Sequence, residues 1–295
     1  MATRTSPPTD RVVAVLDYLV ARSDRTFGLS ELARSLDLSK PTCLGIVTSL
    51  VDAGYLVRDP RAVTYGLGPA LIAAGRAAQD AYALGPMIEA RLERLGVAYG
   101  TTCTASQVVG DRITLLAVTG PGSERSAQVG QSYPFAPPIG LMYVLWDSDD
   151  RFEDWLRREP TLPIALDRDH LRAVVEQCRR TGYLVETLTD IGRRLHSVMA
   201  GVAARELPDD VRELLGEMVS SLGDRVYLGD CDPEDVHGVS VIAAPTYDSR
   251  GRQSMVLTLH IGRSIGGADI VERGRALGAV ADEITASAGG RPPVR

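Results

Sequence analysis

The sequence predicts an α+β protein with an N-terminal winged helix-turn-helix, a linker helix and a larger C-terminal domain. Three observations predict this class. Apolar residues recur at helical spacing up to residue 52 and then give way to two short β-rich runs around a turn. From residue 101 onward, β-rich runs mix with helical segments without regular β-α-β alternation. The 295 residues, 44% hydrophobic and 24% charged, are enough for two folded domains.

Residues 1–9 are predicted to be a disordered tail, and three helices are predicted to follow. Asp10 is expected to cap a helix over residues 12–21, and a short second helix covers residues 32–36. Ser39 is expected to cap a third helix, in which an early proline loses no needed hydrogen bond. That helix should run to about Asp52.

The segment after the third helix predicts a hairpin. Gly54 suits the position after a helix end, where a left-handed backbone is common. Residues 55–58 and 63–67 then read as two strands around the polar turn 59–62. Three helices followed by this ribbon form a winged helix-turn-helix over residues 10–68.

Glycine-proline pairs on both sides of an alanine-rich segment predict a linker helix within residues 69–85. The second domain is then expected over residues 86–288, with the Gly110-Asp111 turn joining its first two strands. Its expected strands cover residues 102–109, 112–119, 183–186, 239–247 and 255–261. Its expected helices cover residues 87–97, 139–145, 149–158, 167–180, 188–205, 209–222 and 268–287, with a loop at 133–138.

Composition excludes several classes of protein. No apolar run is long enough to span a membrane, and the N-terminus lacks a secretory apolar region, so a cytoplasmic protein is expected. The four cysteines are scattered and form no C-x-x-C pair, which disfavours zinc ribbons and redox motifs. The net charge is −6, whereas residues 1–83 hold nine basic and eight acidic residues, a net charge of +1. Nucleic-acid binding must therefore come from local geometry.

The helix-turn-helix pattern carries the functional signal. In such a motif the second helix enters the major groove and presents its N-terminal side chains to base edges. Ser39, Lys40 and Thr42 stand at that helix start, and Lys40 is the only lysine of the chain. Arg58 and Arg61 stand on the wing, within reach of phosphate. The alternative is a three-helix packing unit that touches no DNA.

Several segments resemble the IclR-type bacterial transcriptional regulators. In and just after the expected winged helix-turn-helix, these are "LSELARSLDLSKPT", "LVDAGYLVRD" and "YGLGPALIAAG". In the expected second domain they are "VGQSYPFAPPIG", "GYLVE" and "GVSVIAAPTYDSRGR". The resemblance implies a winged-helix DNA reader, a GAF-like effector-binding domain, and homodimers or dimers of dimers. It also implies repression or activation set by a small organic effector, and a repressor is the expected form. The expected DNA-binding residues are Ser30, Ser39, Lys40, Pro41, Thr42, Cys43, Thr48, Arg58, Arg61 and Tyr65.

The chain also departs from the family pattern. Leu44 and Gly45 stand where a polar or aromatic residue and then an arginine are usual, so the operator sequence cannot be carried over. Residues 188–225 form an insertion, predicted to be helical and peripheral to the sensor core. Fewer polar residues at the expected pocket positions predict an effector that is less polar than a small dicarboxylate. The expected lining residues are Tyr133, Phe135, Pro138, Met142, Val241, Thr258 and His260.

Two further alternatives stay open for that pocket and for the function. Phe135 and Met142 could equally be ordinary core residues, and His260 could be a structural histidine. The acidic run at 230–237 completes no metal site, and no metal or cofactor is expected. No H-E-x-x-H, G-x-S-x-G or Walker motif is present, so a non-enzymatic regulator is expected. The competing reading is a ligand-binding or enzymatic domain whose helix-turn-helix serves only oligomerisation.

Overall fold

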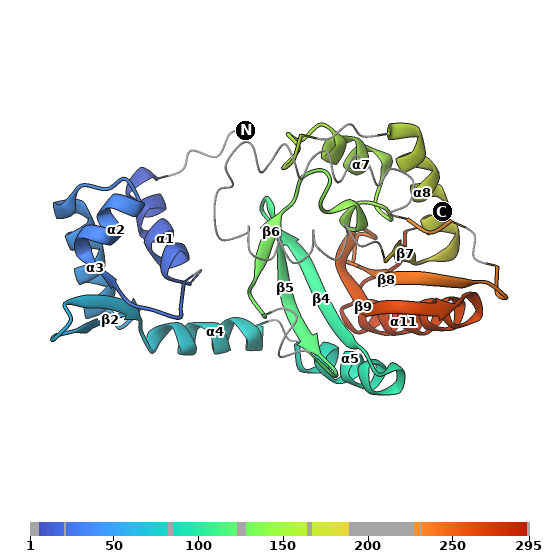
Figure 1. The fold of residues 1–295 in the computed structure, drawn as a ribbon, viewed down its shortest axis with the longest axis horizontal. Coiled ribbons are helices and arrows are strands. Elements are labelled where there is room, and N and C mark those ends of the chain that lie inside the picture. The colour runs from blue at the N-terminus through green and yellow to red at the C-terminus, as the bar shows by residue number, and fades with distance from the viewer. Residues whose placement is uncertain are drawn as a thin grey trace. The chain divides into compact units, whose positions relative to one another are not determined.

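The computed structural model describes residues 6–20, 22–81, 85–122, 128–163, 167–188, 227–229 and 232–293. The chain divides into two compact units, Met1–Ala83 and Leu84–Arg295 (Figure 1). Except for Leu188, the predicted helical insertion lies outside the described residues. Among the described helices, none has both the length and the apolar character that crossing a membrane requires.

The N-terminal unit contains three helices packed against a small antiparallel sheet. The helices are α1 (Pro7–Val20), α2 (Leu29–Ser35) and α3 (Lys40–Asp52). The strands β1 (Phe27–Gly28), β2 (Leu56–Asp59) and β3 (Thr64–Leu67) form a sheet in the order β1-β3-β2. A fourth helix, α4 (Ala70–Ala81), follows the sheet. The apolar faces of the helices and the sheet meet in one core, which includes Val15, Leu32, Val47 and Leu56.

Both predicted ends of α3 are confirmed. The Ser39 side chain accepts a hydrogen bond from the backbone N–H of Thr42 at 3.2 Å, as an N-cap does. Gly54 has a φ of 75°, a left-handed conformation that glycine adopts without penalty.

The N-terminal unit differs from the prediction in three respects. Helix α1 begins at Pro7, inside the segment 1–9 that was predicted to be a disordered tail, and Asp10 therefore lies inside its first turn instead of capping it. The prolines at its start are tolerated because the first N–H groups of a helix need no partner within it. Strand β1 was not predicted, because two residues are too few to show an alternating pattern; Phe27 pairs with Tyr65 of β3.

The C-terminal unit is built on one antiparallel sheet of six strands in the order β6-β5-β4-β9-β8-β7. Its strands are β4 (Thr102–Val109), β5 (Arg112–Thr119), β6 (Ser132–Pro134), β7 (Leu184–Thr187), β8 (Val236–Tyr247) and β9 (Gln253–Gly266). Its helices are α5 (Gly85–Tyr99), the 3₁₀ turn η1 (Leu141–Tyr143), α7 (Asp149–Leu156), α8 (Arg168–Thr181) and α11 (Gly267–Ser287).

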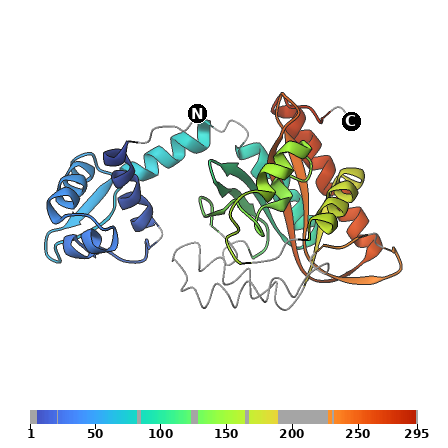
Figure 2. The ribbon, with the colours of Figure 1, turned by 90° about the horizontal axis from the view of Figure 1, so that it is seen from above.

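Helices cover both faces of this sheet (Figures 1 and 2). Helices α5 and α11 bury one face, in a core that includes Leu92, Leu257, Leu259 and Leu277. Helices α7 and α8 and the segment 133–146 pack over part of the other face, where Trp155 is among the buried side chains. The predicted α+β class, with an N-terminal helix-turn-helix, is thereby confirmed.

The helix predicted over residues 139–145 is replaced by the short turn η1. Gly140 has a φ of 102°, which ends any regular helix at that point. A Cβ at this position would lie 2.7 Å from the Phe135 ring, so only glycine fits. By contrast, helix α8 has its predicted caps: the Asp167 carboxylate accepts two backbone N–H groups at 3.0 Å, and Gly182 follows with a φ of 82°.

Candidate functional site

Helix α3 has one buried and one exposed face. Cys43, Val47 and Leu50 point into the core of the N-terminal unit. The opposite face exposes Lys40, Pro41, Leu44, Gly45, Thr48, Ser49 and Asp52. A helix held from one side with its other face open is the arrangement by which a recognition helix enters a DNA groove.

The start of α3 combines a cap with a cation. The Ser39 and Thr42 hydroxyls lie 2.8 Å apart in a mutual hydrogen bond, and Ser39 also accepts the Thr42 N–H. Thr42 is half-buried, so its hydroxyl is committed to the cap. Lys40 is exposed beside this cap, at the positive end of the helix dipole, where phosphate binds favourably.

Two predicted contact residues belong to the core instead. Cys43 is completely buried, and burial raises the pKa of its thiol. Tyr65 is buried on β3, where it pairs with Phe27 and Arg58 across the small sheet. Neither side chain can reach a DNA groove from its position, because each one points into the core of the N-terminal unit. Ser30, by contrast, is exposed on α2.

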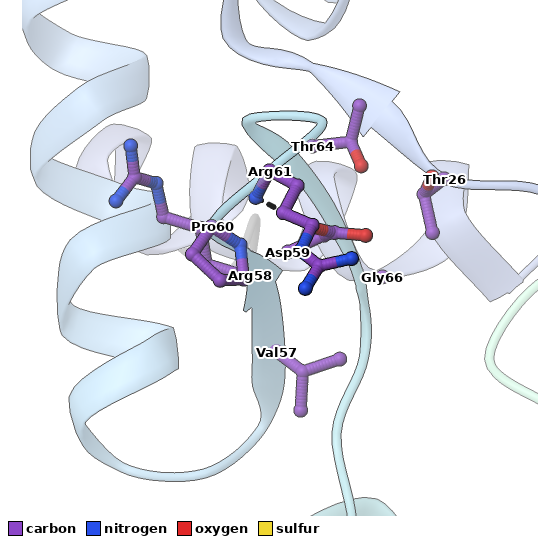
Figure 3. A pocket seen from close by; sticks show the side chains of 8 residues that line it. All are labelled: Thr26, Val57, Arg58, Asp59, Pro60, Arg61, Thr64 and Gly66. Carbon is purple, nitrogen blue, oxygen red and sulfur yellow. Dashed lines mark hydrogen bonds between the residues drawn. The ribbon is translucent and has the colours of Figure 1, made fainter.

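The wing forms an open groove that contains two arginines (Figure 3). Arg58 lies on β2 one residue before its end, and Arg61 lies in the turn that follows. Asp59 holds this turn: its carboxylate accepts the backbone N–H groups of Arg61 at 2.7 Å and Ala62 at 3.1 Å. The N–H groups of Ala62 and Arg61 lower the pKa of Asp59, which stays ionised and keeps the turn in shape.

The described residues offer no acidic side chain as an ion-pair partner to Arg58 or Arg61 within 4.0 Å. Arg25 of the same unit, in comparison, is paired with Glu31 at 2.8 Å. Both wing guanidinium groups are therefore available to phosphate. The groove itself is lined by Thr26, Val57, Arg58, Asp59, Pro60, Arg61, Thr64 and Gly66.

The second candidate site lies on the sheet of the C-terminal unit. Thr102 pairs with His260, which in turn pairs with Val241, and the next row joins Thr104, Thr258 and Ala243. Residues paired across antiparallel strands, and residues two apart along a strand, share one face. Three predicted lining residues, Val241, Thr258 and His260, therefore do share a face.

Hydroxyl groups that sequence reasoning missed gather on the same face. Thr104 Oγ1 lies 3.1 Å from His260 Nε2, and Ser106 Oγ lies 2.5 Å from the Tyr143 hydroxyl. Burial raises the pKa of Tyr143 far above its ordinary value, so the phenol stays protonated and can donate. The signal was present in the sequence, since Thr102, Thr104 and Ser106 alternate with small apolar residues.

The four remaining predicted lining residues lie on the segment that packs over this sheet. Phe135 is buried, and the Arg158 guanidinium lies 4.5 Å from its ring centre, so its role is core packing. Tyr133 and Met142 are half-buried against the same cluster. Pro138 is also half-buried, next to a cis Pro137–Pro138 bond. Of these four residues, Tyr133, Pro138 and Met142 keep partly exposed surfaces.

A metal centre finds no support in the described part of the chain. There, no three histidine, cysteine or acidic side chains gather as a metal ion would require. Two residues of the acidic run 230–237, Asp230 and Cys231, lie outside the described ranges.

Comparisons with known proteins agree with this architecture. Residues 8–60 match the IclR helix-turn-helix domain. The glycerol operon regulatory protein of Streptomyces griseus is 37% identical over 75 residues, which are 25% of this chain and 29% of that protein. The chain thus matches less than a third of that curated relative's length.

Two solved structures resemble nearly the whole chain. An IclR transcriptional regulator from Alicyclobacillus acidocaldarius is 21% identical with a TM-score of 0.65, covering 97% of this chain and all of that one. An IclR homologue from Microbacterium hydrocarbonoxydans, complexed with 4-hydroxybenzoate, is 18% identical with a TM-score of 0.62, covering 95% and 99%. Residues 8–60 therefore match an IclR helix-turn-helix domain, and the chain has the fold seen in solved IclR-type regulators.

Proposed function

We propose that this protein is an IclR-type transcriptional repressor that binds duplex DNA as a homodimer and senses a small organic effector. The observation that carries the proposal is the open face of α3, capped by Ser39, beside a wing whose two arginines have no ion-pair partner among the described residues. A DNA-binding domain of net charge +1 makes few phosphate contacts, which favours a dimer whose two domains bind DNA together.

Selection of bound fragments from a genomic DNA library, followed by measurement of affinity against salt, tests this function. Affinity should fall steeply as salt rises, because bound phosphates release counterions. Lys40→Ala should weaken binding and flatten the salt slope by about one contact in each reader. Arg94→Ala, which removes an exposed cation of the C-terminal unit, is the matched control and should change neither. A protein that retains no fragment at low salt would favour the oligomerisation-arm alternative.

We further propose that the effector is largely apolar with a polar end, and that it binds a GAF-like domain over the sheet face of Thr104, Thr258 and His260. Glu186 shares this face through its pairing with Val241, and its carboxylate repels a dicarboxylate more strongly than a monoacid. The half-buried Tyr133 and Met142 offer apolar contact. The 4-hydroxybenzoate complex of the Microbacterium hydrocarbonoxydans homologue supports an aromatic monoacid as the first probe.

A thermal-shift screen distinguishes the effector classes. A ligand at a hundredfold excess over its dissociation constant adds about 2.7 kcal/mol to the free energy of unfolding. Aromatic monoacids and phenols should stabilise the protein, and Thr258→Val should reduce that gain. Stabilisation by small dicarboxylates alone would contradict the proposed effector class.

A further inference from the structure

The middle of helix α3 presents an apolar surface to solvent. Leu44 is 46% exposed, and Thr48 lies one turn further on the same face. Between Pro41 and Val51 the sequence contains no charged and no amide side chain. The side chains that form bidentate hydrogen bonds with guanine or adenine are therefore missing from this stretch of the helix.

The polar groups beside Leu44 do not change this character. Ser49 turns its hydroxyl back to donate to the Gly45 carbonyl at 3.0 Å. Gly45 adds no side chain, and a Cβ built there would meet nothing within 4 Å. Leu44 consequently stands beside open surface, where a partner can approach the helix backbone closely.

The major groove offers one apolar group to such a side chain, the C5 methyl of thymine. We propose that Leu44 is a specificity-determining residue that reads a thymine methyl group in each half of the DNA site. This inference rests on the proposed DNA-binding function and names what its recognition helix selects. Lys40 at the start of α3 and the wing arginines Arg58 and Arg61 supply the charge that brings the helix to the groove.

Deoxyuridine substitution tests this contact, because it removes only the C5 methyl group from thymine. In a fragment that the protein binds, each thymine of one half-site is replaced in turn, and affinity is measured at fixed salt. At one position the replacement should weaken wild-type binding about fourfold, the effect of one buried methyl group. Leu44→Ala removes the contact from both half-sites, so it should weaken binding of the thymine fragment about fifteenfold. The deoxyuridine replacement should then weaken the binding of this variant no further.

Two variants serve as controls for this coupling. Leu44→Met keeps an apolar side chain of similar volume and should retain the sensitivity to deoxyuridine. Val57→Ala truncates a side chain of nearly equal exposure, 47%, on the wing and should also retain it. Because Leu44 lies outside the core, its variants should keep the melting temperature of the wild type.

Three results would overturn the inference while leaving DNA binding intact. The first is a bound site in which no deoxyuridine replacement matters. The second is a Leu44→Ala protein that keeps the full deoxyuridine effect. The third is a change in the sedimentation of the free protein on Leu44→Ala, which would assign Leu44 to a contact between copies of the chain. Failure to bind any fragment would instead reject the proposed function, and this inference with it.

Discussion

At the scale of single residues, the start of α3 depends on two short side chains. Ser39 and Thr42 are hydrogen-bonded to one another through their hydroxyls, and Ser39 also binds the Thr42 N–H. This leaves Lys40 as the exposed residue at the helix start whose polar group the cap does not use. The sequence places all three residues in one motif, but only Lys40 keeps its polar group free of the cap.

Ser39→Ala should destabilise α3 locally, because the Thr42 N–H then loses its acceptor. Loss of an N-cap costs about 1 kcal/mol, which corresponds to about fivefold faster amide exchange in the first turn of the helix. Hydrogen-exchange mass spectrometry of the α3 peptide measures this. Ser49→Ala in the same helix removes only a bond to the Gly45 carbonyl and should not speed exchange. Equal exchange in all three proteins would argue against the cap.

Val63, at the tip of the wing, has a φ of 54°, which is unfavourable for a β-branched residue. Val63→Asn should raise the free energy of unfolding of the N-terminal unit by about 1 kcal/mol, because asparagine tolerates this conformation. Val57→Asn is the matched control, since Val57 is 47% and Val63 49% exposed, and it should give no such gain. Chemical denaturation followed by hydrogen exchange of the wing compares the two variants. A loss of stability in Val63→Asn would contradict the strain.

Burial protects the cysteines that lie in the described part of the chain, Cys43, Cys103 and Cys178. Burial raises the pKa values of Cys103 and Cys178 to about 12, which leaves about one thiol in 10⁴ ionised at pH 8. Iodoacetamide should therefore leave both unlabelled in the native protein and label them in urea, as peptide mass spectrometry can determine. Since the thiolate is the reactive form, labelling should become appreciable only as the pH rises toward 12. Rapid native labelling at pH 8 would contradict this burial.

Side-chain burial marks the limit of what the sequence predicted about the site. Capping by Ser39 and exposure of Lys40 follow from local chemistry, and both are seen. Cys43 was misplaced because only half a turn of helix separates a groove-facing residue from a core residue, and the packing of α3 decides which residues face the core. The Tyr143 hydroxyl was missed because its partner, Ser106, is 37 residues away in the chain.

At the scale of elements, periodic segments were predicted best. Helix α11 was expected over residues 268–287 and spans Gly267–Ser287. An amphipathic pattern of this length predicts a helix and no other element. The strands β1 and β6 were not predicted, since they have only two and three residues. They exist because a neighbouring strand offers free backbone groups, which is a tertiary cause that local sequence does not contain.

Helix α5 lies unusually close to the sheet at Gly96. A Cβ there would lie 2.9 Å from the Thr101 carbonyl oxygen and 3.0 Å from the Gly120 Cα. Gly96→Ala should therefore lower the free energy of unfolding by about 1–3 kcal/mol, because backbone atoms must move. Gly278→Ala, in α11, meets nothing within 4 Å and should raise it by about 0.5–1 kcal/mol.

Urea unfolding followed by tryptophan fluorescence can measure both changes, since Trp146 and Trp155 are both buried in the C-terminal unit. The two glycines differ in the space around them, so the same substitution should lower the free energy of unfolding at Gly96 and raise it at Gly278. The same sign for both variants would contradict the close approach of α5 to the sheet.

At the scale of the whole molecule, two units with separate cores carry two different kinds of surface. The N-terminal unit presents cations and an exposed helix face, whereas the C-terminal unit presents hydroxyls and a histidine on a sheet. A regulator requires that occupation of one surface alter the affinity of the other. That coupling is a free energy, and it can be measured without knowing how the units are arranged.

If the effector regulates DNA binding, the two affinities must change by the same factor. An effector that weakens DNA binding tenfold must itself bind tenfold more weakly to the DNA-bound protein, because both routes reach the same complex. Titration of the effector with and without saturating DNA fragment, and of DNA with and without saturating effector, measures both factors. Thr258→Val should weaken effector binding and leave DNA affinity without effector unchanged, because Thr258 lies in the C-terminal unit. A ligand that stabilises the protein but changes neither affinity would show two independent units, and the sheet face would then bind a molecule for some purpose other than regulating this DNA site.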